Sequence, residues 1–156
     1  MNQPPEPAPP DSPPDFRPRL RWLTLALMGA QVGYILVGWL VVHHAGRAST
    51  PDAPVISACA LVLGLLLIAF SFLIVGVLRP ASPGTRPGNF QLTQQFFLGF
   101  AVAESGATIG LVVCLIFHVW PVLVILATSA AVAIYGHYRR VARRMDEANP
   151  TPSSPP

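Results

Sequence analysis

The sequence predicts an all-α integral membrane protein, a bundle of four transmembrane helices with disordered proline-rich tails at both ends. Hydrophobic residues make up 52% of the 156-residue chain and charged residues only 11%, whereas a soluble domain carries roughly 25% charged residues. The apolar residues gather in four long runs, and the arginines lie almost entirely on one side of the topology that these runs imply. Each observation indicates a chain that faces lipid over most of its length.

The four apolar runs are predicted to cross the membrane at about residues 22–42, 55–78, 96–117 and 121–138, within a membrane domain of residues 19–145. About 20 residues at 1.5 Å each span a hydrocarbon core of roughly 30 Å, and the first three runs reach that length. The fourth is shorter and must begin at the turn His118–Pro121, because proline is well tolerated at a helix start. The second run, rich in Leu, Ile, Val and Phe, is expected to be the helix most exposed to lipid.

The two ends of the chain differ sharply from its middle. Residues 1–18 contain eight prolines, and residues 146–156 have a similar composition. Proline lacks the N–H donor that a helix needs, and these segments have too little apolar surface to pack. Both are therefore predicted to be disordered tails.

The arginines predict the orientation of the bundle. With four spans, the side that carries both termini holds nine arginines and the opposite side holds only Arg47; the nine are Arg17, Arg19, Arg21, Arg79, Arg86, Arg139, Arg140, Arg143 and Arg144. Cytoplasmic loops of membrane proteins carry this excess of positive charge. The distribution predicts a multi-pass protein of a bacterial inner (cytoplasmic) membrane, with both termini in the cytoplasm.

Small residues on two spans indicate close helix packing. Helices in lipid associate through close backbone approach and polar contacts, because lipid tails are as apolar as the side chains. The first span has a GxxxG motif at Gly29 and Gly33. The third has a row of small residues on one face, formed by Gly99, Ala103, Gly106 and Gly110. We interpret both as packing faces within one chain; the alternative is an interface in a homo- or hetero-oligomer.

Several classes of function find no support in the sequence. No phosphate loop, dinucleotide fingerprint or hydrolase motif is present, so no catalytic residue and no cofactor is predicted. Cys59 and Cys114 lie inside apolar runs without metal-ligand spacing, and no metal site is predicted. His118 and His137, which flank the fourth run, are expected at the membrane interface. The net charge of +3 comes from arginines beside the spans, which fits the lipid bilayer as partner and not nucleic acid.

Glu104 is the residue from which a function can be argued. It lies eight residues into the third run, roughly 12 Å deep at 1.5 Å per residue. A charged side chain near the bilayer midplane costs about 2.5–3.5 kcal/mol on insertion scales, and such residues pair with polar groups of other helices. The candidate partners are Gln31 between the two glycines of the first span, Thr108 one turn along, and Ser71, Thr128 or Ser129 on other spans.

The segment Arg86–Val113, RPGNFQLTQQFFLGFAVAESGATIGLVV, resembles the polar loop and second helix of the proteolipid subunit c of rotary ATP synthases. Arg86 and Pro87 stand in the loop, Glu104 is the mid-membrane carboxylate, and Gly110 begins the Gly-Leu-Val that follows it. The resemblance implies that Glu104 binds and releases a proton or a sodium ion.

Two functions therefore remain open from the sequence. In the first, the chain is a non-catalytic membrane protein with a structural, assembly or accessory role, and Glu104 holds helices together. In the second, the chain binds protons or sodium through Glu104, with Gln31 and Thr108 as further candidates at the site.

Overall fold

The computed structural model describes residues 17–44, 52–77 and 89–148, which form four long helices. These are α1 (Arg17–His44), α2 (Ala53–Val77), α3 (Asn89–Phe117) and α4 (Trp120–Ala148), and the described residues contain no strand. All four helices are long and apolar enough to cross a membrane. The predicted fold class, an all-α bundle of four membrane-spanning helices, is confirmed.

α1 and α4 both extend beyond their apolar runs, at the end of the bundle where α1 begins and α4 ends. α1 begins at Arg17 and α4 continues to Ala148, so the boundaries predicted for the two tails were wrong by a few residues. The two extended helix ends meet, and the guanidinium of Arg17 lies 3.0 Å from the carboxylate of Asp146. The remainder of both predicted tails lies outside the described residues.

The connection between α3 and α4 is as tight as the sequence predicts. His118 adopts a left-handed backbone conformation, with φ of 56°, and its N–H donates to the carbonyl of Cys114 at 2.9 Å. A left-handed residue just past a helix end satisfies a carbonyl that would otherwise lack a donor. α4 then begins at Trp120 with Pro121 in its first turn.

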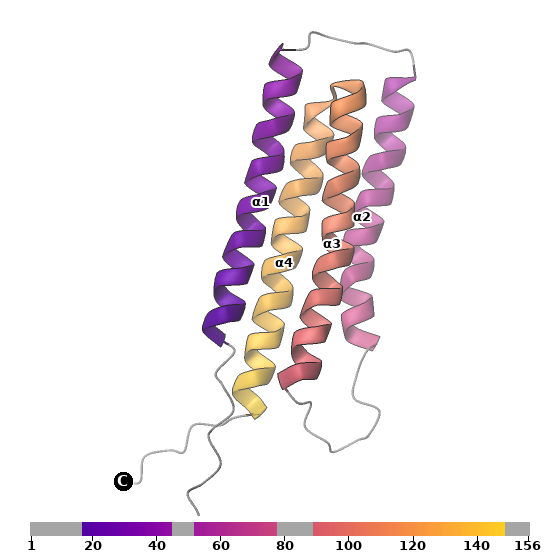
Figure 1. Cartoon of the computed structure of the whole chain (residues 1–156). Helices are drawn as coiled ribbons and strands as arrows, with labels where there is room; N and C mark the ends of the chain where they lie inside the picture. The colour runs from indigo at the N-terminus through magenta and orange to yellow at the C-terminus, as the bar shows by residue number, and fades with distance from the viewer. Residues whose placement is uncertain (1–16, 45–51, 78–88, 149–156) are drawn as a thin grey trace, which may run out of the picture.

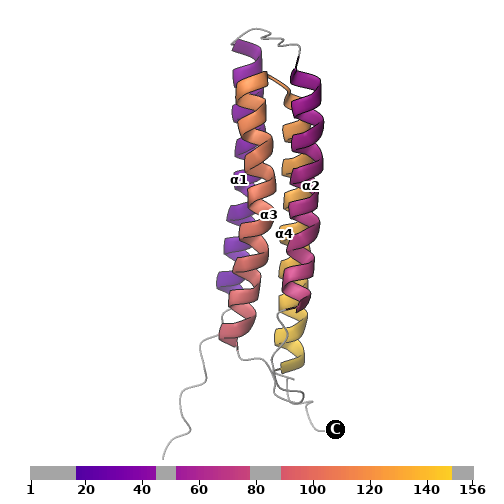
Figure 2. The same cartoon turned by 90° about the vertical axis from the view of Figure 1, so that its right-hand side faces the viewer.

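Successive helices run antiparallel, and α3 and α4 form the centre of the bundle (Figure 1). α2 packs mainly on α3 and α1 packs mainly on α4, while α1 and α2 make no contact among their described residues. In Figure 2, turned by 90°, α3 lies in front of α1 and α2 lies in front of α4, and both of these pairs are in contact, though less extensively than α2 with α3 or α1 with α4. Consecutive helices of the sequence are therefore not all neighbours in space.

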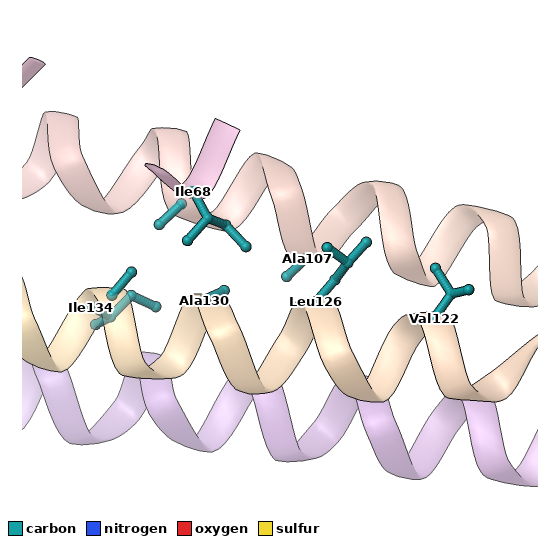
Figure 3. Packing of buried hydrophobic residues seen from close by; sticks show 8 residues of the cluster. Ile68, Ala107, Val122, Leu126, Ala130 and Ile134 are labelled. Carbon is teal, nitrogen blue, oxygen red and sulfur yellow. The ribbon is translucent and has the colours of Figure 1, made fainter. Parts of the chain in front are cut away.

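The main apolar core belongs to three of the four helices. Its buried members come from α2, α3 and α4 and are Ile68, Ala103, Ala107, Val122, Leu126, Ala130, Ala133 and Ile134. Figure 3 shows Leu126 and Ala130 of α4 facing Ala107 of α3, with Ile68 of α2 above them. Alanines on both central helices bring the two backbones close, which is the packing that a lipid environment favours.

α1 lies at the edge of this core and is the helix most exposed to lipid. Only 11% of its most apolar window is buried, against 28% for α2. The expectation that the second span would be the most lipid-exposed was wrong. Bulky side chains on α2 indicated lipid contact, yet Ile68 and Val75 of that helix point into the bundle.

The row of small residues on α3 lies inside the bundle. Ala103 is fully buried, and a methyl group added at Gly106 would lie 2.8 Å from the carbonyl oxygen of Gly64 on α2. At Gly110 the added carbon would lie 3.1 Å from the side chain of Leu126 on α4. Gly99 faces Val75 and the ring of His137. Hydrogen is the only substituent that these close approaches accommodate without a shift.

The interpretation of Gly29 and Gly33 as a packing face within the chain was wrong. A methyl group added at either position would meet no atom of another described residue within 4 Å. The reason is helical geometry. Residues advance by 100° each, so positions two before and two after the buried Gln31 lie on the opposite side of α1.

The close packing at Gly106 and the open space at Gly29 predict that the same Gly→Ala substitution destabilises the bundle at the first position and not at the second. Gly106→Ala should destabilise the bundle by about 1–3 kcal/mol, because overpacking forces the α2 and α3 backbones apart. Gly29→Ala is the matched control, since it adds the same methyl group to open space. The measurement is reversible unfolding of the purified protein in mixed micelles. Equal stability of the two variants would contradict the close contact of α2 and α3.

Candidate functional site

Glu104 lies on the side of α3 that faces α1, and two side chains of α1 donate hydrogen bonds to it. The hydroxyl of Tyr34 donates to Oε1 at 2.7 Å. The side-chain amide of Gln31 donates to Oε2. Each carboxylate oxygen therefore has its own donor from the neighbouring helix. The contact of Gln31 with Glu104 that the sequence suggested is present, whereas Tyr34 is a partner that sequence reasoning missed.

The spacing of Gln31 and Tyr34 places both on one face of α1. Residues three apart are neighbours on a helix surface, and this face is the one turned toward α3 and α4. Gln31 is only 2% exposed, and Glu104 and Tyr34 are half-buried. The sequence could have indicated Tyr34 as the second donor, because it lies three positions from Gln31 within the same apolar span.

The other candidate partners of Glu104 are engaged elsewhere. The hydroxyl of Thr108 donates to the main-chain carbonyl of Glu104 at 3.0 Å, and the side chain is exposed. Thr108 therefore does not make the bond to the carboxylate that the sequence had suggested, but its side chain lies beside the Tyr34 hydroxyl and so borders the site. Ser71 lies against His137 on another side of the bundle.

One polar atom at this site has no partner among the described residues. The carbonyl oxygen of the Gln31 side chain, Oε1, is buried and accepts no hydrogen bond. An amide group carries a donor and an acceptor at its two ends, so rotation about its last side-chain bond exchanges them. The side-chain oxygen of Gln31 is therefore an unused hydrogen-bond acceptor close to the carboxyl group of Glu104.

A second polar contact lies between α2 and α4 and was not predicted. His137 is fully buried, so its expected place at the membrane interface was wrong. The Ser71 hydroxyl donates to the carbonyl of Ile68 at 2.6 Å, and the same oxygen lies 2.9 Å from Nε2 of His137. With the Ser71 proton so engaged, Nε2 is the donor and Nδ1 is an unprotonated acceptor, with no partner among the described residues.

Gly99 makes room for the His137 ring inside the bundle. A methyl group at position 99 would lie 3.1 Å from two atoms of that ring. The ring also packs on Phe72 of α2, with centroids 4.4 Å apart. The sequence placed His137 at the interface because the apolar run ends at Tyr138, whereas α4 continues as a packed helix well beyond that residue.

Polar contacts also join the helices near the described chain ends. Arg144 of α4 donates to the side-chain carbonyl of Gln95 on α3 at 3.1 Å. Around it, an apolar cluster from three helices is formed by Leu20, Leu92, Phe96, Val141 and Met145. The part of the chain that the structure describes holds no group of three or more metal-ligating side chains.

The fold and these intramembrane polar contacts define a small multi-pass α-helical membrane protein. No family model, curated protein or solved structure matches the chain. Its function is therefore argued from the contacts of Glu104 and from the surface of the bundle.

Proposed function

We propose that this protein is a non-catalytic membrane protein with a structural, assembly or accessory role, in which Glu104 fastens α1 to the other three helices. The observation that carries this proposal is the pair of hydrogen bonds from Gln31 and Tyr34 to the two oxygens of Glu104. The carboxyl group faces a neighbouring helix of the same chain. A group in that position is suited to holding helices together.

The energetics of α1 support this role. α1 contributes no buried residue to the main apolar core, and its glycine motif is unpacked. Apolar surface does not draw helices together in lipid, so polar contacts are disproportionately important. Hydrogen bonds between membrane helices contribute about 0.6 kcal/mol on average and up to about 1.7. Two such bonds on one carboxyl group therefore add to the packing of α1 on α4, where Gly38 lies against Leu123.

A second candidate function is reversible binding of a proton or sodium ion at Glu104. The unpartnered Oε1 of Gln31 favours it. After an amide rotation this oxygen accepts a hydrogen bond from a protonated Glu104, and it is also a suitable ligand for a hard cation. The resemblance of Arg86–Val113 to the proteolipid subunit c of ATP synthases adds to this candidate.

Labelling by dicyclohexylcarbodiimide, a reagent for protonated carboxyl groups in membranes, separates the packing role from sodium binding. We expect labelling of Glu104 to proceed at the same rate in sodium and in potassium, because the carboxyl group serves helix packing. Gln31→Leu with Tyr34→Phe should accelerate labelling, since both hydrogen-bond donors are lost. Glu104→Gln is the control that identifies the labelled residue. Protection by sodium but not potassium would overturn the packing role and establish ion binding.

For the membrane location, we propose a bacterial inner membrane with both termini in the cytoplasm. The nine arginines on one side of the topology support this orientation. A cysteine introduced at the exposed Arg19, in a chain with Cys59 and Cys114 replaced by alanine, should resist a membrane-impermeant maleimide in intact cells and react after lysis. Reaction in intact cells would reverse the proposed orientation.

A further inference from the structure

The arginine-rich surface at the end of α4 is the strongest feature that the proposed function does not use. Figure 1 shows the last turns of α4 at the same end of the bundle as the start of α1. A hollow of about 400 Å³ opens there, lined by Gly136, Arg139, Arg140, Arg143, Arg144 and Glu147. Four guanidinium groups against one carboxylate make this hollow strongly positive.

Helical spacing explains why these arginines share one hollow. Arg139 and Arg143 are four residues apart, as are Arg140 and Arg144, so the two pairs form adjacent rows on one side of α4. α4 extends past its most apolar part to carry them as regular helix. A helical frame holds the charges at fixed separations, whereas a disordered basic tail would not.

Aromatic rings fix two of the four guanidinium groups at the level where the apolar surface ends. Arg139 lies over the ring of Tyr135, 5.9 Å from its centroid, and Arg140 lies over Phe72 of α2 at 5.6 Å. A cation over an aromatic face is attracted to it. Tyrosines gather at the boundary between lipid tails and headgroups, and Tyr135 lies under Arg139, which lines this hollow. The arginines therefore stand at headgroup depth.

One of the two acidic residues at the end of α4 is not available to neutralise the hollow. Asp146, on the same turn of α4, is paired with Arg17 of α1 at 3.0 Å. Glu147 is the remaining acid that lines the hollow. Arg144 makes a hydrogen bond to Gln95, a neutral side chain that leaves its charge uncompensated.

We propose that this hollow, termed here the α4 arginine hollow, binds the phosphate headgroup of an anionic phospholipid. Guanidinium groups bind phosphate through paired, charge-assisted hydrogen bonds. The aromatic and apolar side chains on the membrane side of the hollow contact the acyl chains of the same lipid. The ligand is a lipid and not a soluble phosphate, because the hollow opens at the boundary where the apolar surface of the helices begins.

The test is native mass spectrometry of the purified full-length chain in detergent, with phosphatidylglycerol or phosphatidylcholine added. We expect retention of phosphatidylglycerol in preference to phosphatidylcholine. Arg139→Gln with Arg143→Gln should weaken phosphatidylglycerol binding about 25-fold, since each arginine beside an anionic membrane surface contributes roughly fivefold. Circular dichroism of the variant checks that the helices are intact.

Arg19→Gln with Arg21→Gln is the matched control, because it removes two exposed arginines on α1 at the same end of the bundle. Neither lines the α4 arginine hollow, and Arg21 lines a separate hollow with Arg17 and Trp22. This control should retain the preference for phosphatidylglycerol. Equal loss in both double variants would show a diffuse charge effect and overturn the proposal. Absence of any preference between the two lipids would overturn it as well. Competition by millimolar inorganic phosphate as effective as by the lipid would identify a soluble anion site instead.

Should Arg139→Gln with Arg143→Gln fail to fold, Arg139→Lys with Arg143→Lys keeps the charges and removes the paired geometry. We expect this variant to bind phosphatidylglycerol several-fold more weakly than the native chain, because an ammonium group does not make the paired contact of a guanidinium group. Unchanged binding would contradict recognition by the guanidinium groups.

Discussion

The carboxyl group of Glu104 is the polar contact through which, in our proposal, α3 holds α1. It accepts hydrogen bonds from Gln31 and Tyr34, which come from a helix that adds no buried residue to the main apolar core. In water, the exposed apolar surface of α1 would be driven into the bundle, but in lipid it has no such tendency. Placing a carboxyl group in a membrane costs free energy, and the hydrogen bonds that Glu104 accepts there offset part of that cost.

Close approach of helices at small residues also holds the bundle together, as at the buried Gly38, where α1 lies against Leu123 of α4. Gly64 of α2 and Gly106 of α3 leave room for each other, and Gly99 leaves room for the buried ring of His137. His137 then reaches Ser71 across the bundle. The small residues of α3 thus determine both how near the helices lie and which polar side chains can meet, while its other face presents Glu104 to α1.

Composition and hydropathy were sufficient to predict the number of spans, because a run of about 20 apolar residues has few other structural meanings. The contact between Gln31 and Glu104 could also be predicted from the sequence, because a buried acid needs a polar partner and the spans contain few polar side chains. The sequence did not predict that Gly29 and Gly33 lie outside the packed interface, because a GxxxG motif does not reveal which way its face points. His137 was missed because the apolar run ends beside it, whereas helix packing continues past that end. Tyr34 was missed because an aromatic residue in a span reads first as apolar surface.

A double-mutant cycle between Tyr34→Phe and Glu104→Ala measures the central interaction most directly. Free energies of unfolding of the four proteins in mixed micelles give the coupling between the two side chains. The hydrogen bond seen between α1 and α3 predicts a coupling of about 0.5–1.7 kcal/mol. The pair Tyr34→Phe and Ser105→Ala is the control and should show none, because the exposed Ser105 hydroxyl donates to the Ala101 carbonyl of its own helix. A coupling of zero between Tyr34 and Glu104 would contradict the account of how α1 is held.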